Sequence, residues 1–115
     1  MKKTPSKPKK MSKVSSLKKQ YIKPGSVCKV TFRLPKEAVK GAQRVNIVGE
    51  FNDWSIEANP MKPLRSGEFA LTLDLKSGME YRFRYLVDGY RWENDWNADR
   101  YERNIYGSDD SVVVV

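Results

Sequence analysis

The sequence predicts an all-β protein, an antiparallel β-sandwich that follows a lysine-rich N-terminal tail. From Pro24 onward, short runs of alternating apolar residues are separated by turn residues every eight to twelve positions, which is typical of sandwiches and barrels. No segment has the period of an amphipathic helix. The net positive charge of the chain comes from lysines near the N-terminus, which lie outside the alternating pattern.

The first 23 residues hold nine lysines and neither Asp nor Glu, whereas the remaining residues hold 13 basic and 14 acidic side chains. A like-charged segment with few apolar residues cannot bury enough surface to offset the entropy of ordering it. We therefore expect residues 1–22 to be a disordered tail and residues 23–115 to form one domain. Such a tail can contact polyanions non-specifically, but it has no arginine with which to read guanine.

Two strands are expected in the first half of the domain. The run 27–34 ends at Pro35, and its alternation buries Val30, Phe32 and Leu34. The run 44–49 directs Val45 and Ile47 inward and leaves Asn46 outside. Both runs therefore present one apolar face, as half-buried strands do.

The second half contains three further runs. One alternation comprises Phe69, Leu71, Leu73 and Leu75. In the segment 81–92, Asp88-Gly89 predicts a two-residue type I′ hairpin. The same segment places on its core face Tyr81, Phe83, Tyr85 and Val87. Arg84 then projects from the sheet. The final run 111–115 is apolar on both faces, so it must be a central or covered strand.

Composition excludes most enzyme chemistry. The chain has no histidine and Cys28 is its one cysteine, so it cannot build a Ser-His-Asp or Cys-His relay, a Cys/His zinc site or an internal disulfide. Fourteen carboxylates leave glycoside hydrolysis open, but none falls in a distinctive motif, and a lone small sandwich has no second layer to enclose a sugar. We expect a non-catalytic protein without a cofactor or metal.

One stretch invites comparison with a calcium loop, because oxygen-bearing side chains alternate from Glu93 to Asp99. Counted from Glu93, however, the sixth position is Ala98 where such a loop needs Gly, and the twelfth is Asn104 where it needs Glu. We interpret the alternation as the solvated face of a strand.

The three tryptophans are the most informative residues. Trp54, Trp92 and Trp96 lie where loops or strand ends are expected, among Asn, Asp and Glu. An exposed indole can lie against the C–H face of a sugar ring while neighbouring polar groups bond its hydroxyls. The alternative is that a small sandwich uses these large side chains in its core.

Within residues 29–115, several motifs follow one another in a consistent order: Val48-Gly-Glu-Phe-Asn-Asp-Trp54, Pro60-Met-Lys-Pro-Leu64, Gly67-Glu-Phe69, Leu73-Asp-Leu-Lys-Ser-Gly78, Tyr81-Arg-Phe-Arg-Tyr-Leu-Val-Asp-Gly89 and Gly107-Ser-Asp-Asp-Ser-Val-Val113. With these motifs the sequence resembles the glycogen- and starch-binding modules of isoamylases, branching enzymes and the β subunit of AMP-activated protein kinase. The resemblance implies an early-set immunoglobulin-like sandwich and a shallow site for α-1,4-glucan.

The resemblance also implies site residues. Trp54 and Trp92 match two tryptophans that clasp the glucan, although Trp92 lies one residue later than in the kinase module, which leaves Tyr90 as an alternative. Arg84 matches a basic residue on the preceding strand. A Leu-Gly-Thr-x-Asn element of the family corresponds here to Tyr106, Ser108 and Asp110.

Two of these positions depart from the family pattern. Asp110 replaces an amide, which removes two N–H donors and adds a negative charge, and Tyr106 replaces a leucine with a larger planar side chain. If the chain is a weakened member of the family, Asp110→Asn should tighten sugar binding.

Together these observations indicate non-catalytic binding of glycogen, starch or maltooligosaccharide through surface tryptophans. A protein-interaction or scaffold domain of the same fold is the alternative, with a protein partner or a glucan-active enzyme bound at a sheet edge or the tail. Burial of Trp54 and Trp92 would favour that alternative. No apolar run approaches the ~18 residues of a membrane span. The absence of an apolar signal segment, together with the presence of only one cysteine, indicates a cytoplasmic location.

Overall fold

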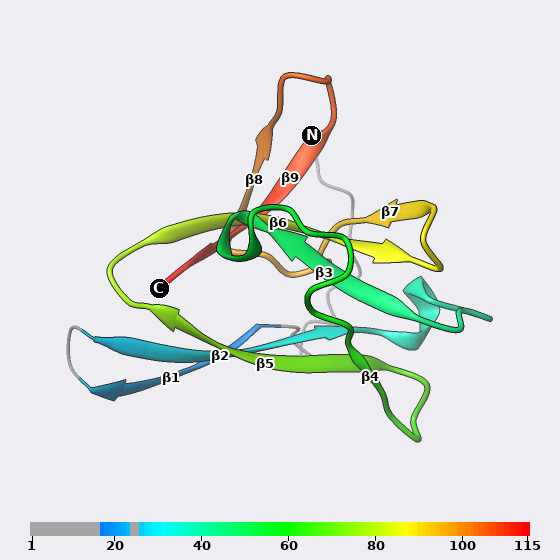
Figure 1. Cartoon of the computed structure of the whole chain (residues 1–115), viewed down its shortest axis with the longest axis horizontal. Helices are drawn as coiled ribbons and strands as arrows, with labels where there is room; N and C mark the ends of the chain where they lie inside the picture. Colours follow the sequence, from blue (N-terminus) through cyan, green and yellow to red (C-terminus); the bar gives the residue numbers. More distant parts are fainter. Residues whose placement is uncertain (1–16, 24–25) are drawn as a thin grey trace.

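The computed structural model describes residues 17–23 and 26–115. Their strands form two facing sheets, seen edge-on in Figure 1, and every strand pair in these ranges is antiparallel. The predicted fold class, an all-β antiparallel sandwich, is confirmed. Expected tail residues 1–16 lie outside the described residues.

The first sheet has the order β1-β2-β5-β4. Its strands are β1 (Lys18–Lys23), β2 (Val27–Leu34), β5 (Phe69–Lys76) and β4 (Lys62–Pro63). The second sheet has the order β3-β6-β9-β8, with β7 paired to β6. Its strands are β3 (Val45–Gly49), β6 (Glu80–Val87), β9 (Asp109–Val114), β8 (Arg100–Arg103) and β7 (Arg91–Glu93). Short 3₁₀ turns follow β2 and β3, as η2 (Lys36–Ala38) and η3 (Glu50–Asn52).

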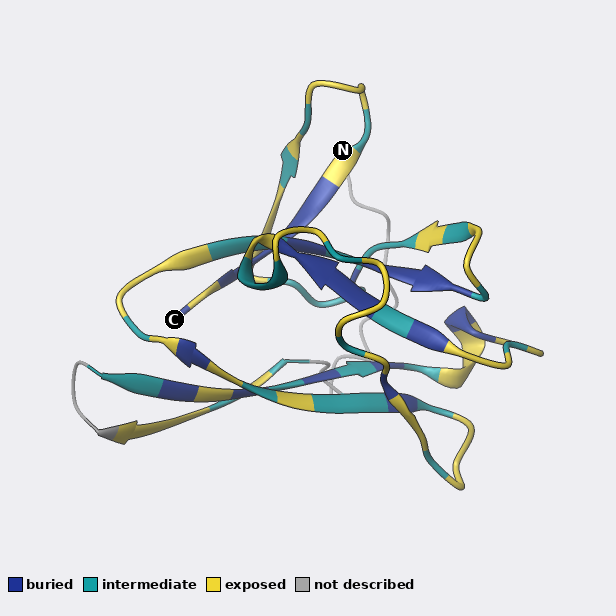
Figure 2. Ribbon diagram, viewed as in Figure 1, coloured by how far each residue is buried: buried dark blue, intermediate teal, exposed yellow. Residues whose placement is uncertain are grey.

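The core lies between the two sheets and follows the predicted alternation, as Figure 2 shows along β2, β3 and β6. Its buried members include Val30, Phe32, Leu34, Val45, Ile47, Phe83, Tyr85 and Val87. Phe32 from the first sheet meets Phe83 from the second edge to face, with ring centroids 5.0 Å apart. Such a pair adds about 0.5–1.5 kcal/mol to the area it buries. The aromatic contact therefore joins the sheets at the centre of the sandwich.

The remaining predicted strands also take their expected places. Phe69 and Leu75 of β5 are buried, while Leu71 and Leu73 are half-buried and pack against the core. Strand β9 lies between β6 and β8, so the apolar C-terminal run is a central strand. Its backbone is paired on both sides, which removes the exposed apolar edge that the sequence would otherwise present.

The expected tail boundary at residue 22 is wrong, because residues 18–22 belong to β1. This strand pairs with β2 from Lys18 opposite Thr31 onward. Two contacts hold this strand in place despite the positive charge of its lysines. Leu17 packs against the core, and Lys19 Nζ lies 2.7 Å from Asp99 Oδ2, in the loop between β7 and β8. The same Asp99 oxygen accepts a hydrogen bond from the backbone of β9, so β1 is tied to the C-terminal strand.

The predicted two-residue hairpin also needs correction. Asp88 and Gly89 have the positive φ angles of a type I′ turn, at 53° and 79°, but Val87 pairs with Arg91 and the loop therefore holds three residues. Tyr90 is the additional residue. Because Leu86 consequently pairs with Trp92, the tryptophan lies on the outer face; a two-residue loop would have set Trp92 opposite the core residue Tyr85.

Among the described residues, none belongs to a helix with the length and apolar character needed to cross a membrane.

Deleting residues 1–22 should destabilise the protein, because the deletion removes most of β1 together with Leu17. Burying a leucine contributes about 1.5–3 kcal/mol, so for half-buried Leu17 and its strand we expect a loss of at least about 1 kcal/mol and ~4–8 °C in Tm. Thermal unfolding followed by circular dichroism measures the change, with Lys18→Ala at an exposed position of β1 as the control. An unchanged Tm after the deletion would show that β1 adds nothing to stability.

Asp88 should make the protein sensitive to acid. Its Oδ1 accepts hydrogen bonds from the backbone N–H groups of Arg44 at 3.0 Å and Gln43 at 2.8 Å, and these bonds lower the pKa of the carboxyl. The corresponding stability is present above the ordinary Asp pKa of about 3.9 and is lost as the pH falls through the lower folded value. Urea unfolding between pH 6 and 2.5 should show a smaller loss in Asp88→Asn, whose amide oxygen accepts bonds without titrating. An identical acid profile in both proteins would contradict this role.

Candidate functional site

The structure separates the three tryptophans. Trp54 and Trp92 are exposed, with 41% and 43% of their surface accessible, whereas Trp96 is half-buried and packs against the core. For a side chain as large as tryptophan, an exposed fraction near two fifths leaves a broad apolar surface in contact with water. The prediction that these residues occupy loops or strand ends holds for Trp54 and Trp96, whereas Trp92 is the middle residue of the short strand β7 (Arg91–Glu93). Only Trp54 and Trp92 present such a surface.

Trp54 is held by the turn that ends β3, and the motif Gly49-x-Phe51-Asn52-x-Trp54 explains how. A Cβ on Gly49 would lie 2.6 Å from the backbone oxygen of Arg82, so only glycine lets this turn approach β6. Phe51 packs beside Phe32, with centroids 5.7 Å apart, and anchors the turn to the core. The backbone N–H of Trp54 then donates to the Gly49 oxygen at 2.8 Å.

Asn52 fixes the loop that follows. Its Oδ1 accepts from the backbone N–H groups of Gly49 and Ser55, at 3.1 and 3.2 Å, and its Nδ2 donates to Ile47 O at 3.1 Å and Asn59 Oδ1 at 2.7 Å. A single side chain therefore joins both ends of the loop to β3. Asn52 thereby holds the backbone from which the exposed indole of Trp54 projects.

The register of the second sheet places Arg84 and Trp92 on its outer face. Leu86 pairs with Trp92, and Arg84 pairs with Val48 one residue before the turn that carries Trp54. Leu86 and Val48 also face outward, yet they are 5% and 1% exposed. The outer face of β3, β6 and β7 is therefore packed, with side chains covering its apolar residues.

Arg84 and Trp92 are in direct contact. The guanidinium carbon of Arg84 lies 5.7 Å from the centroid of the Trp92 ring, within the range of a cation–π interaction, which contributes about 0.5–1 kcal/mol at exposed sites. Arg84 Nε is buried and, among the described residues, has no hydrogen-bond partner. The predicted outward orientation of Arg84 is confirmed, and its guanidinium lies beside an exposed indole.

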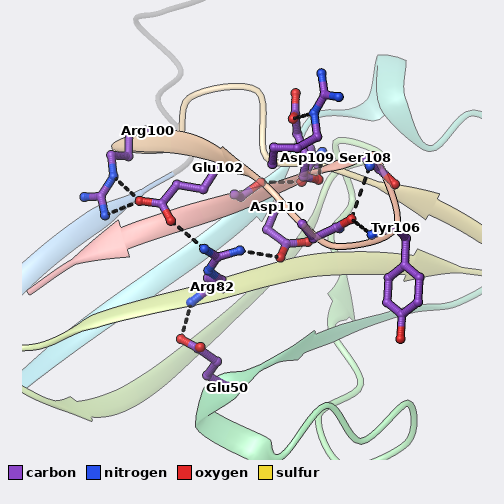
Figure 3. Close-up of polar contacts among 12 residues, drawn as sticks. Glu50, Arg82, Arg100, Glu102, Tyr106, Ser108, Asp109 and Asp110 are labelled. Carbon is purple, nitrogen blue, oxygen red and sulfur yellow. Dashed lines mark hydrogen bonds and ion pairs between the residues drawn. The ribbon is translucent and has the colours of Figure 1, made fainter.

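Tyr106 and Ser108 lie in the loop between β8 and β9. Tyr106 is 86% exposed and its ring extends from the loop in Figure 3, whereas Ser108 is half-buried. Asn104 Oδ1 accepts hydrogen bonds from the backbone of both residues, at 2.9 and 3.1 Å. Tyr106 therefore presents a free aromatic ring on a loop that Asn104 organises.

Asp110 has a different environment, since only 5% of its surface is exposed. Its Oδ2 pairs with Arg82 Nη1 at 3.3 Å, and its Oδ1 accepts from Asn104 Nδ2 at 3.0 Å (Figure 3). Both oxygens are thus bonded within the protein. Sequence reasoning did not identify Arg82 or Asn104, because an arginine and an asparagine on a strand and a loop carry no motif of their own.

The predicted residues therefore fall into two neighbouring groups. Arg84 and Trp92 touch, and Trp54 follows the strand next to Arg84, whereas Tyr106, Ser108 and Asp110 belong to the β8–β9 hairpin. Asn94, two residues after Trp92, connects the groups. Its Nδ2 donates to Asp109 O at 2.8 Å, and its Oδ1 accepts from Ser111 Oγ at 2.7 Å.

The stretch from Glu93 to Asp99 is not a solvated strand face, contrary to our interpretation. Strand β7 ends at Glu93, and Asp95 is 1% exposed. The Tyr85 hydroxyl donates to Asp95 Oδ2 at 2.6 Å, and burial, followed by the charge of Asp95, raises the pKa of Tyr85 well above its usual value. Within residues 17–23 and 26–115, no group of His, Cys, Asp and Glu is arranged to hold a metal ion.

Comparison with known proteins identifies a family for most of this chain. Residues 30–114 match the family described as the glycogen recognition site of AMP-activated protein kinase. A comparison with curated proteins found no match. The matched range begins within β2 and ends in β9, so it leaves out β1 but includes strands of both sheets and all the candidate site residues. The chain belongs to the family of the glycogen recognition site of AMP-activated protein kinase, a family of carbohydrate-binding modules.

Proposed function

We propose that the protein binds α-1,4-glucan without catalysing a reaction, through Trp54, Trp92 and Arg84. The observation that carries this proposal is the exposure of two indoles, one in the turn after β3 and one on β7, the second in contact with the guanidinium of Arg84. Indoles supply flat apolar area for the C–H faces of glucose rings, and the guanidinium supplies N–H donors for their hydroxyl oxygens. Glycogen, starch and maltooligosaccharides all present these groups.

The contacts of the carboxylates near this face favour a binding function over glycoside hydrolysis. Glycoside hydrolysis requires two carboxyl groups that flank a bound sugar with room to act. Glu50 accepts a hydrogen bond from Arg82 N at 2.8 Å, Glu93 forms an ion pair with Arg91, and Asp110 is buried. These acids stabilise the scaffold, so the face offers a surface for stacking and hydrogen bonding.

A protein-interaction domain of the same fold is the second candidate. Ile105 and Tyr106 are 89% and 86% exposed at the tip of the β8–β9 hairpin, and adjacent apolar residues with such exposure are typical of contact surfaces. A glucan-active enzyme in the cytoplasm is a partner compatible with both candidates. Binding of isolated oligosaccharide distinguishes them, because an interaction domain that has lost the sugar site would not bind it.

Trp54→Ala and Trp92→Ala should each abolish measurable binding of maltoheptaose. Because both side chains are exposed, each truncation should lower the free energy of unfolding by less than about 1 kcal/mol. Titration of ¹⁵N-labelled protein with maltoheptaose measures binding, and urea unfolding measures stability.

Trp96→Ala is the matched control for these variants. Trp96 packs against the core, so its truncation should cost stability, up to the about 3–5 kcal/mol seen for buried tryptophans. At a temperature where this variant stays folded, it should still bind the sugar. Indole resonances of Trp54 and Trp92 that do not move with sugar in the unmutated protein would contradict the proposed function.

Deletion of Tyr90 should leave sugar binding within about twofold of the unmutated protein. The shortened loop becomes the two-residue Asp88-Gly89 turn that the sequence favours, and Trp92 remains opposite Leu86 on the outer face. The same titration measures the affinity. A complete loss of binding would instead show that Tyr90 itself contacts the sugar, since it is 76% exposed beside Trp92.

A further inference from the structure

We propose that Asp110 acts on the bound glucan indirectly, as one link in a chain from Arg82 through Asp110 and Asn104 to the loop that presents Tyr106. This inference rests on the proposed function, since it assigns a role in the same site. In it, Asp110 is a positioning residue. The contact with sugar belongs to the ring of Tyr106.

The first link is the ion pair on the outer face of the second sheet. Asp110 pairs in register with Glu102 of β8, and two carboxylates directly opposite each other repel. Arg82 resolves this repulsion: its Nη1 lies 3.3 Å from Asp110 Oδ2 and its Nη2 lies 2.6 Å from Glu102 Oε1. With 5% of its surface exposed, Asp110 depends on this partner, because a buried unpaired carboxylate is costly.

The second link is the side-chain amide of Asn104. Its Nδ2 donates to Asp110 Oδ1 at 3.0 Å, and a carboxylate can only accept. The carboxylate at position 110 therefore anchors the NH₂ end of the amide at β9 and reinforces the orientation of Oδ1 toward the loop, which the backbone N–H groups of Tyr106 and Ser108 also require. An asparagine at position 110 carries no charge, so its hydrogen bond to the Asn104 amide would be weaker and the amide would be held less firmly.

The third link is the loop itself. The Asn104 side chain accepts from the backbone of Tyr106 and Ser108, while the Asn104 backbone donates to Ser108 O at 2.8 Å and accepts from Gly107 N at 3.1 Å. In the described part of the chain, these are the hydrogen bonds that hold residues 105–108. Figure 3 shows the Tyr106 ring extending from this turn, and 86% of the residue's surface is exposed. The direction of the ring therefore depends on Asn104, and through it on Asp110.

The chemistry explains how Asp can stand at a position where the resemblance implies an amide. The acidic side chain gives up direct hydroxyl recognition, because both of its oxygens are bonded within the protein. In exchange it gains a charged partner and sets the amide of Asn104. Asp110→Asn should then weaken sugar binding, which is the opposite of what direct contact by an amide at this position would produce.

The test is a double-mutant cycle between Asp110→Asn and Tyr106→Ala, with maltoheptaose titrated into ¹⁵N-labelled full-length protein. Weakening of one positioning hydrogen bond predicts that Asp110→Asn weakens binding about 3- to 10-fold. In the Tyr106→Ala background, the same substitution should have no further effect, because the group that it positions is gone. Asn104→Ala, which removes the next link, should behave in the same way.

A measurement without sugar tests the loop directly. Heteronuclear ¹⁵N NOE values of the amides of residues 105–108 should fall in Asp110→Asn and in Asn104→Ala. Asp109→Asn is the matched control, because it removes an exposed ion pair to Arg103 on the same hairpin, at 3.3 Å, without touching Asn104. It should change neither the NOE values nor the affinity. Asp110→Asn and Asn104→Ala test the same link separately, so if one variant misfolds, the other still provides the test.

The outcomes separate this inference from the proposed function. Tighter binding in Asp110→Asn, or an equal loss of affinity with and without the Tyr106 ring, would overturn the positioning role in favour of direct contact. Unchanged NOE values in both variants would overturn the link to the loop. Absence of binding by the unmutated protein would refute the proposed function. The NOE values, which are measured without sugar, would still show whether Asp110 orders the loop.

Discussion

The alternation of side chains along β6 is the constraint on which both the core and the candidate site depend. One face of this strand supplies Phe83, Tyr85 and Val87 to the interior, and the other supplies Arg82 and Arg84 to the outer face. Because β3, β7 and β9 all pair with β6, its register also determines what stands beside these arginines. A shift by one residue would exchange the two sets and remove the core and the site together.

The two arginines of β6 show how neighbours give one residue type two roles. Arg82 is two residues from Arg84 on the same face, but it lies beside Asp110 and Glu102 and neutralises both. Arg84 lies just past Phe83, the last residue of β6 that pairs with β9, and its neighbour there is Trp92. Its Nε has no hydrogen-bond partner among the described residues. The first guanidinium stabilises the sheet through ion pairs, and the second packs against an exposed indole.

The fold and the exposed aromatic residues could be predicted from the sequence because they depend on local pattern. Alternation identified the buried faces of β2, β3 and β6, and the position of Asp88-Gly89 located the hairpin. Strand β1 was missed because its stability comes from Leu17 and from Asp99, a residue 80 positions away from Lys19. The surroundings of Asp110 were missed for the same reason, since its partners Arg82 and Asn104 lie on other elements and become neighbours only in the folded sheet.

The β6–β7 loop has a consequence for how related sequences are compared. Here three residues separate the paired positions Val87 and Arg91, and the tryptophan stays on the outer face because it remains opposite Leu86. Distance from the turn is therefore a poor guide to equivalence, since a loop can gain a residue while the strand pairing is kept. An alignment of such chains should place its gap inside the loop and match residues by their partner on β6. Equivalent aromatic residues would then be found at different sequence spacings.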